Sequence, residues 1–420
     1  VTKGDDAMTF KLIYKFFAVL LSIIIMLVLG FTIYIQSILP DSFYIVQGQN
    51  LTINSKFPIV ATSINKKFEP QTYGTPGNTY KMDLKLAGGV NIKQVNVQVV
   101  ERKLVVPAGT PFGIKMFTQG VMVVGFSDIA VNDQMVNPAK LAGLKAGDIV
   151  LEMDGRKINS NDDLISYVMQ SGGNQIQLRV RRKNTILVLN ITPVLTPEDN
   201  AYKVGMWVRD SSAGIGTMTF YDPATKTFGG LGHAICDVDT GDIMPLQSGE
   251  IVDVTITGVT KGVSGTPGEL KGKFNSAASN GTLQINNETG VFGIVNSPPT
   301  KNQPIPLALR SEIVNGKAQV LTTINSEPPQ LYDAEIEKIN YSDANPTKNM
   351  VIRITDPKLL AETGGIVQGM SGSPIIQNGM LVGAVTHVFV NDPTRGYAIF
   401  AENMERSTSY IKNSNMKNAA

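Results

Sequence analysis

The sequence has few of the residues that mark several common protein classes. Its 420 residues include one cysteine, one tryptophan and two histidines. A single cysteine excludes an internal disulfide and a cysteine-rich metal site. The 37 Lys and Arg nearly balance the 35 Asp and Glu, so the formal charge is only +2. That charge is too small to attract phosphate backbones over the whole surface, and we expect no nucleic-acid partner.

Glycine and proline are abundant instead, with 40 and 22 residues. This composition favours many short strands and tight turns over long helices. Hydrophobic residues make up 42% of the chain, which excludes a disordered protein. The length predicts two to three domains in a mainly β fold.

A hydrophobic run without charge covers residues 16–35, FFAVLLSIIIMLVLGFTIYI. At about 1.5 Å per residue a helix of this length spans about 30 Å, which is one hydrocarbon thickness. Lys3, Lys11 and Lys15 precede it, so residues 1–15 should stay in the cytoplasm and everything after the span should cross. A cleaved signal peptide is the alternative, but its apolar core is usually shorter and ends at a small-residue site. We therefore predict a transmembrane anchor.

Residues 36–106 are predicted to form a stalk followed by a small β module. The stretch from Tyr80 to Val106 alternates apolar and polar residues around Gly88 and Gly89, which is typical of a hairpin of half-buried strands.

Residues 107–193 carry a more specific pattern, PAxxAGLxxGDxVxxxDG, beginning at Pro138. It predicts a short helix, a strand over 149–153 and a tight turn, then a second helix capped by Ser160 or Asn161. Two hairpin strands, IQLRVRR and TILVLNI, follow. The segment resembles a PDZ domain, an α/β fold, of the kind found in bacterial proteases.

PDZ domains hold an extended peptide by strand addition and cradle its terminal carboxylate on an apolar-Gly-apolar loop. Phe112, Gly113 and Ile114 match that loop. The alternative is that these residues simply begin a strand and that the domain only spaces its neighbours.

Residues 194–411 are rich in glycine and short strands, which suits a double β-barrel or a large sandwich. Residues 412–420 are polar and are expected to form a flexible tail.

The strongest chemical signal is GIVQGMSGSPII, in which Ser371 lies between glycines. Such a loop exposes the hydroxyl and can direct backbone N–H groups into one small volume. Ser371 is the predicted nucleophile, and the N–H groups of Gly369 and Ser371 are the predicted oxyanion donors.

A serine nucleophile needs a base, and the chain offers two imidazoles. His233 lies in the glycine-rich segment FGGLGHAICD and is the predicted base. His387 lies in the apolar strand AVTHVFV, where it could be a core residue or line the substrate pocket. Cys236 is close to His233 in sequence, but most single cysteines are inert packing residues. No cofactor or metal is expected.

Several motifs together carry a resemblance to a known family. They are RDSSAGIGTMTFYDP, GGLGHAICDVDTGD, VIRITDPKLL and TGGIVQGMSGSPIIQNGMLVGAVTHVFVNDPTRGYAI. With the span and the PDZ segment, they resemble the stage IV sporulation protein B peptidases of endospore-forming bacteria. The resemblance implies a chymotrypsin-like double β-barrel with His233 as base, Ser371 as nucleophile and Asp356 as orienting carboxylate. Asp356 departs from the usual chymotrypsin layout, and proximity in sequence does not choose among the carboxylates that follow His233, which are Asp237, Asp239, Asp242 and Asp253. Asp253 remains the preferred alternative.

The family also implies a biological role. Its members are membrane-tethered serine endopeptidases of the forespore inner membrane that face the space between forespore and mother cell. They cleave themselves, which could release them, and then cut the regulatory subunit of the complex that processes pro-σK. The alternative function is a PDZ-containing signalling scaffold without catalysis.

Overall fold

The computed structural model describes residues 3–55, 57–63, 76–275 and 279–418. Part of the predicted stalk, 64–75, and the last two residues of the predicted tail lie outside these ranges. The chain forms two compact units. Unit 1 comprises residues 1–102, 309–315 and 338–345, and unit 2 contains the remainder.

Unit 1 begins with the long helix α1 (Lys3–Ile38). Its segment Ile13–Ile38 has a mean hydropathy of 2.9 and is long and apolar enough to cross a membrane. The last turn of α1 behaves differently, because Ile35 is only 1% exposed. Next to Ile35, the Gln36 side chain donates to the Ile92 carbonyl at 2.5 Å. The apolar helix therefore ends inside the core of unit 1.

The rest of unit 1 is a four-stranded sheet in the order β1-β4-β3-β2. The predicted hairpin is confirmed, because β3 and β4 pair as antiparallel neighbours on either side of Gly88 and Gly89. Two segments from much later in the chain complete the unit, and Glu312 in the first of them binds Arg102 through both carboxylate oxygens. The strands are β1 (Ser42–Val46), β2 (Ile59–Ser63), β3 (Thr79–Leu86) and β4 (Val90–Val100), and the late segment 309–315 contains the 3-10 turn η2 (Arg310–Glu312).

The PDZ segment of unit 2 folds largely as its sequence predicts. Helix α2 (Pro138–Leu141) starts behind the Asn137 cap. Helix α3 (Asn161–Gln170) starts at Ser160, whose hydroxyl and the Asp163 carboxylate form a reciprocal capping box. The strands of this segment are β7 (Ile129–Val131), β8 (Gln134–Val136), β9 (Ile149–Met153), β10 (Arg156–Lys157), β11 (Ile176–Arg182) and β12 (Thr185–Ile191).

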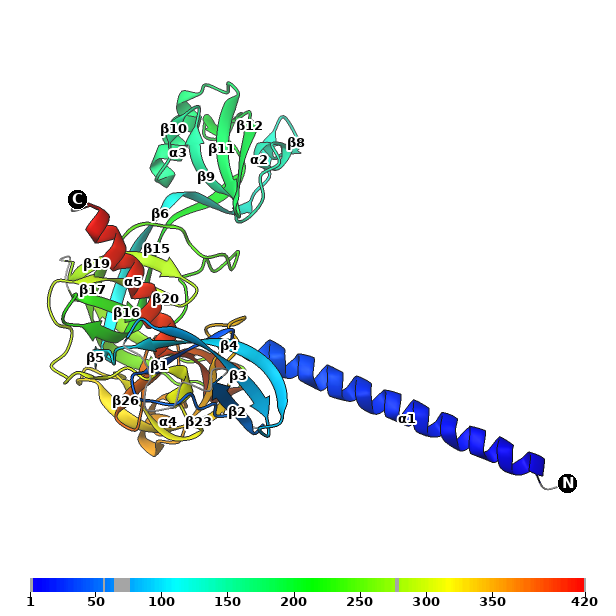
Figure 1. The fold of residues 1–420 in the computed structure, drawn as a ribbon. Coiled ribbons are helices and arrows are strands. Elements are labelled where there is room, and N and C mark those ends of the chain that lie inside the picture. The colour runs from blue at the N-terminus through cyan, green and yellow to red at the C-terminus, as the bar shows by residue number, and fades with distance from the viewer. Residues whose placement is uncertain (1–2, 56, 64–75, 276–278, 419–420) are drawn as a thin grey trace. The chain divides into compact units, whose positions relative to one another are not determined.

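Strands β7 and β8 pair only with each other, whereas β9 to β12 belong to a thirteen-stranded sheet that extends into the C-terminal region. Eleven of its strands follow the order β12-β11-β9-β6-β17-β19-β20-β16-β15-β5-β21, and β10 and β18 pair at the side of this path with β9 and β17. Strand β6 (Pro111–Phe126) is long enough to pair with β15 along its whole length, with β17 along its first part and with β9 nearer its end (Figure 1). Because β15 also pairs with β6, the pairings β6-β17-β19-β20-β16-β15 form a closed circuit. The other strands are β5 (Leu104–Pro107), β15 (Met206–Asp222), β16 (Thr227–Gly230), β17 (Leu246–Thr260), β18 (Glu269–Phe274), β19 (Gly281–Asn287), β20 (Gly290–Val295) and β21 (Ile305–Pro306).

A closed six-stranded barrel, β22-β23-β24-β27-β26-β25, follows. Its strands are β22 (Gly316–Thr322), β23 (Gln330–Ile339), β24 (Met350–Ile354), β25 (Pro374–Gln377), β26 (Met380–Phe389) and β27 (Asp392–Phe400). Helix α4 (Pro357–Thr363) lies between β24 and β25 in the chain, and the small hairpin β13 (Val194–Thr196) with β14 (Ala201–Lys203) precedes β15. The predicted double barrel thus corresponds to one closed barrel and one extended sheet.

The chain ends in helix α5 (Ala401–Asn418). Met404 and Ile411 on this helix are buried against strands of unit 2. The flexible tail predicted from residue 412 is therefore helical as far as Asn418, because apolar residues upstream dock the helix on the sheet.

Candidate active site

The loop that carries Ser371 joins α4 to β25, and its shape requires glycine. Gly369 and Gly372 both have φ of +94°, a conformation that side chains disfavour. A Cβ at Gly372 would lie only 2.0 Å from the carbonyl oxygen of Thr217 on β15. The Gly-Met-Ser-Gly sequence is therefore needed for a tight loop pressed against β15.

Thr217 fixes the direction of the peptide groups in this loop. Its hydroxyl donates to the Gly369 carbonyl at 2.8 Å, and its N–H donates to the Ser371 carbonyl at 3.0 Å. Among the described residues, the N–H groups of Gly369 and Ser371 have no hydrogen-bond acceptor, whereas those of Met370 and Gly372 do. Two unpaired N–H groups beside a serine hydroxyl are what an oxyanion site requires.

His233 lies in the loop between β16 and β17. Its Nδ1 donates to the Ala234 carbonyl at 2.8 Å, because a carbonyl oxygen can only accept. The proton is thereby held on Nδ1, and Nε2 is left as the basic nitrogen. Burial lowers the pKa of His233, and the bond to Ala234 opposes part of that lowering. The imidazole is therefore held neutral, in the form that can accept a proton.

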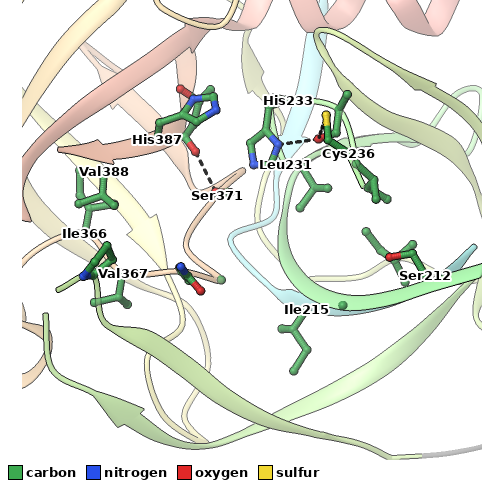
Figure 2. Close-up of a pocket in the computed structure, with 18 of the residues that line it drawn as sticks. Ser212, Ile215, Leu231, His233, Cys236, Ile366, Val367, Ser371, His387 and Val388 are labelled. Atoms are coloured by element: carbon green, nitrogen blue, oxygen red, sulfur yellow. Dashed lines mark hydrogen bonds between the residues drawn. The ribbon is translucent and has the colours of Figure 1, made fainter. Parts of the chain in front are cut away.

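Ser371 and His233 line the same cavity of about 500 Å³ (Figure 2). The Ser371 hydroxyl donates to the Thr386 carbonyl at 2.9 Å in this state. Because the Ser371 hydroxyl proton is hydrogen-bonded to this carbonyl, the Ser371 side chain must rotate before His233 can accept the proton. The cavity walls are mostly apolar and include Ile114, Ile215, Leu231, Ile235, Ile366, Val367, Val388 and Val390.

His387 lies at the end of β26 and lines this cavity as well. Its ring centroid is 5.0 Å from that of His233, with the planes tilted by 38°. Burial lowers the pKa of His387 to about 4, although solvent still reaches the side chain, and the nearby His233 and Lys348 add to the lowering. Of the two sequence-based alternatives for His387, a core residue or a residue lining the substrate pocket, its position on the cavity wall fits the second.

The structure brings neither expected carboxylate to this cavity. Asp356 caps α4, where one oxygen accepts from the N–H groups of Lys358 and Leu359 and the other from that of Asp333. Asp253 on β17 accepts instead from the Asn280 side chain. An Asp before Pro at a helix start has a structural use as a cap, and that use accounts for Asp356 here.

Cys236 lines the cavity but burial and Asp242 raise its thiol pKa, which does not favour a thiolate. Among the described residues, no group of three or more His, Cys, Asp or Glu side chains could hold a metal ion.

The prediction that residues 112–114 form the carboxylate-binding loop of the PDZ domain is wrong. Phe112, Gly113 and Ile114 lie inside β6 and pair with β15 on one side and β17 on the other. Phe112 and Ile114 are buried in the core of unit 2. Both edges of this segment are occupied, so it cannot accept a peptide strand.

A groove elsewhere has the features that the motif predicted. It has a volume of about 700 Å³ and lies between α3 and the first residues of β15. Val204, Gly205 and Met206 supply an apolar-Gly-apolar segment that leads into the strand. Among the strands that the structure describes, β6 is the only partner of Met206 and Val208, so their other edge is unpaired. The groove is lined on the helix by Leu164, Ile165, Val168 and Met169, and Trp207 at its rim is 65% exposed.

Comparisons with known proteins match two parts of the chain to two families. Residues 200–405 match the family model of the SpoIVB peptidase S55, and residues 94–192 match that of a PDZ domain. The peptidase match contains Ser371, His233 and His387, and the PDZ match ends before Val204.

Several curated proteins are similar over shorter stretches. A candidate zinc metalloprotease of Bartonella henselae is 36% identical over 80 residues, which cover 19% of this chain and 22% of that protein. A DegP-like probable periplasmic serine endoprotease of Brucella suis is 28% identical over 163 residues, covering 37% of this chain and 31% of that protein. The chain thus spans less than a third of either relative.

Solved structures match over about a fifth of the chain. The PDZ domain of an SdrC-like protein from Listeria monocytogenes is 22% identical, covers 21% of this chain and 87% of that one, and has a TM-score of 0.18. The second domain of a Listeria innocua protein is 24% identical, covers 22% and 85%, and has a TM-score of 0.18. The two family matches, with the serine loop and imidazole found in one cavity, identify the chain as a member of the SpoIVB peptidase S55 family of serine peptidases that carries a PDZ domain.

Proposed function

We propose that this chain is a serine endopeptidase in which Ser371 is the nucleophile and His233 is the base. The observation that carries the proposal is a single cavity lined by Ser371, His233 and Gly369. The N–H groups of Gly369 and Ser371 are unpaired among the described residues. A neutral imidazole, a hydroxyl and an oxyanion site are the parts that acyl transfer needs.

The reaction follows from these positions. The Ser371 hydroxyl leaves the Thr386 carbonyl, gives its proton to Nε2 of His233 and attacks the substrate carbonyl carbon. The carbonyl electron pair moves to oxygen, where the two N–H groups stabilise the charge. His233 then protonates the leaving amine, and water hydrolyses the acyl-enzyme by the same route in reverse.

The Ala234 carbonyl takes the orienting role in this mechanism. In most serine peptidases a carboxylate accepts from Nδ1 and stabilises the imidazolium. A carbonyl oxygen keeps the correct tautomer but carries only a partial charge, so we expect a weaker base than in a full triad. Asp356 and Asp253 would act on His233 only after a rearrangement of the elements that hold them.

We propose further that the two circuits of β-strands form the two barrels of a chymotrypsin-like peptidase. The support is the closed pairing circuit that includes β6, β15 and β17, beside the barrel of β22 to β27. Ser371 precedes a strand of the barrel and His233 lies between two strands of the circuit, so the cavity lies between the two.

The proposed substrates are protein segments, including this chain itself and the regulatory subunit of the complex that processes pro-σK. Family membership supports these substrates, and the apolar segment of α1 supports a single-pass anchor in the forespore inner membrane. The groove beside α3 is the proposed site for an extended peptide that adds to the free edge of β15.

The test is to express the full chain and its Ser371→Ala variant in membranes and to follow chain length by mass spectrometry. Ser264→Ala, which changes an exposed serine outside the cavity, is the matched control. Discrete trimming in the parent and the control, and none in Ser371→Ala, would support the peptidase. Identical fragments from all three chains would contradict it.

A fluorophosphonate probe separates a waiting enzyme from a scaffold. If no chain is trimmed but the probe labels Ser371, the nucleophile is active and lacks a substrate. If Ser371 is neither labelled nor needed for trimming, the chain is a PDZ-containing scaffold.

A further inference from the structure

The loop after His233 folds back on itself as a small hairpin. We define the His233 hairpin as residues 235–244. The N–H of Met244 donates to the Ile235 carbonyl at 3.1 Å, and the N–H of Asp237 donates to the Asp242 carbonyl at 2.9 Å. Only Ala234 separates His233 from this hairpin, and the Ala234 carbonyl holds the imidazole. Contacts that hold the His233 hairpin in place therefore also position the His233 imidazole.

Asn286 on β19 holds the neck of the His233 hairpin. Its side-chain oxygen accepts from the Ile235 N–H at 2.8 Å. Its side-chain nitrogen donates to the carbonyls of Ile235 and Met244, both at 2.9 Å. One amide group thus joins both strands of the hairpin, two residues from His233.

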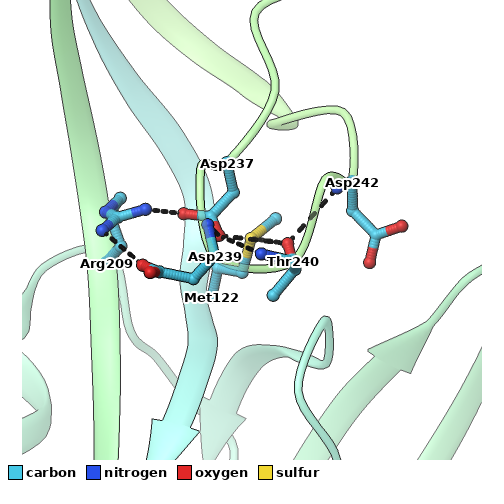
Figure 3. A network of polar contacts seen from close by, with 6 residues as sticks. All are labelled: Met122, Arg209, Asp237, Asp239, Thr240 and Asp242. Atoms are coloured by element: carbon cyan, nitrogen blue, oxygen red, sulfur yellow. Dashed lines mark hydrogen bonds and ion pairs between the residues drawn. The ribbon is translucent and has the colours of Figure 1, made fainter. Parts of the chain in front are cut away.

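Asp237 organises the tip of the hairpin, and its carboxylate is fully buried. One oxygen accepts from the N–H of Asp239 at 3.0 Å and from the N–H and hydroxyl of Thr240 at 2.9 and 3.1 Å (Figure 3). A buried carboxylate is stable only where its charge and lone pairs are satisfied.

Arg209 on β15 supplies the opposite charge. Its Nη1 donates to the second oxygen of Asp237, and its Nη2 donates to Asp239 at 2.8 Å (Figure 3). The planar guanidinium can make both bonds at once in a fixed geometry, which a lysine cannot reproduce. Arg209 therefore ties the hairpin tip to β15.

The same strand positions the nucleophile. Eight residues beyond Arg209, Thr217 holds the carbonyls of Gly369 and Ser371. The strand between them lines the cavity with Ser212, Gly214 and Ile215. The distance between base and nucleophile is thereby set by one continuous strand that holds each of their loops.

We propose that Arg209 and Asn286 are positioning residues of the peptidase, which hold the His233 hairpin at its tip and neck and so set the place of the imidazole. The inference rests on the proposed function, because it assumes that His233 is the base. Neither side chain lines the cavity, so both act through Ala234 and the hairpin backbone.

The experiment measures labelling of Ser371 by a fluorophosphonate probe in the full-length chain in detergent, as a function of probe concentration and pH. The variants are Arg209→Gln, Arg209→Lys and Asn286→Asp. The Asp side chain keeps an acceptor for Ile235 and loses both donors. Matched controls on the PDZ segment are Arg179→Gln, which breaks an exposed ion pair with Glu152, and Asn174→Asp at an exposed turn.

We expect Arg209→Gln and Asn286→Asp to lower the maximal labelling rate about tenfold to hundredfold, because small displacements of a catalytic group have effects of that size. Probe affinity should change little, the pH midpoint should move, and Arg209→Lys should recover part of the rate. Wild-type rates and midpoints in folded Arg209→Gln and Asn286→Asp would overturn the proposal. If Arg209→Gln does not fold, wild-type labelling rates and pH midpoints in Asn286→Asp and Arg209→Lys overturn the proposal.

Hydrogen exchange gives a second readout that does not depend on catalysis. The N–H groups of Thr240 and Met244 should exchange faster in Arg209→Gln and Asn286→Asp than in the controls. Unchanged exchange there would also overturn the proposal. A parent chain whose Ser371 is not labelled would instead reject the proposed function, while exchange would still test whether the two residues hold the hairpin.

Discussion

At the scale of single residues, the composition limits the choice of base and the structure sets its protonation. Only two histidines are present, so the sequence could name His233 as a candidate but not its tautomer. The Ala234 carbonyl fixes that tautomer, and burial favours the neutral ring. These two local effects make the imidazole ready to accept a proton.

The first prediction concerns the pH dependence of cleavage. Because burial lowers the pKa of His233 below its ordinary value of 6.5, kcat/KM should fall with falling pH only below that value. Cleavage of a peptide substrate at a series of pH values measures the midpoint. Cys236→Ser is the control and should have the same profile. A midpoint above 6.5 would contradict His233 as the base.

The second prediction concerns His387 and stability. In the unfolded chain this imidazole takes up a proton near pH 6.5, whereas in the folded chain its pKa is lowered to about 4. The unfolded state therefore binds more protons between these values, and the free energy of unfolding falls as the pH falls through them. Urea unfolding of the parent and of His387→Gln should show a shallower loss in the variant. Parallel curves would contradict the lowered pKa.

At the scale of elements, β15 does the most to assemble the site. Its first residues form the free edge of the groove beside α3, Arg209 holds the hairpin tip, and Thr217 holds the serine loop. The motif RDSSAGIGTMTFYDP contains Arg209 and Thr217, but nothing in its pattern indicates which loops these two residues hold.

The third prediction tests Thr217. Thr217→Val keeps the shape and the backbone N–H but removes the hydroxyl that donates to the Gly369 carbonyl. A neutral hydrogen bond contributes about 0.5 to 1.5 kcal/mol, so kcat should fall by up to about tenfold with little change in KM. Thr257→Val, on an exposed part of β17, is the control. An unchanged kcat would mean that the glycines alone shape the oxyanion site.

The fourth prediction tests the groove beside α3. Ile165 is 54% exposed and lines the groove, so Ile165→Glu should abolish binding of peptides with an apolar C-terminal residue without unfolding the domain. Ile186→Glu on β12 is the matched control, since Ile186 is 45% exposed and lies outside the groove. Fluorescence anisotropy with a free and an amidated C-terminus measures the binding. Equal binding by both variants would place the peptide site elsewhere.

At the scale of the whole molecule, two parts of helix α1 have different environments. Its apolar segment suits a membrane, while Ile35 and Leu39 near its end are 1% and 3% exposed within unit 1. Because its last turn contributes to the core of unit 1, the helix cannot be truncated at an arbitrary residue without loss of that packing.

The fifth prediction follows from that arrangement. Deletion of residues 1–30 should release the chain from membranes and leave the melting temperature of unit 1 unchanged. Deletion of residues 1–39 should also destabilise unit 1, because burial of a large aliphatic side chain contributes about 2 to 5 kcal/mol. Membrane flotation and thermal unfolding measure the two effects. Equal melting temperatures for both deletions would contradict a structural role for Ile35 and Leu39.

The sequence alone determined what depends on neighbouring residues. Local signals predicted α2, α3 and the hairpin of β3 and β4, because Pro138, Ser160 and Gly88 act within a few positions of the chain. The uncharged run predicted the apolar helix, and the long motifs indicated the peptidase and PDZ families.

Only the tertiary structure decided what depends on distant segments. It buried Phe112 to Ile114 between β15 and β17, assigned Asp356 to a helix cap and placed His387 beside His233. It also joined residues 309–315 and 338–345 to unit 1. Strand pairing and side-chain packing between residues far apart in the chain cannot be read from local patterns, because each local pattern is compatible with several partners.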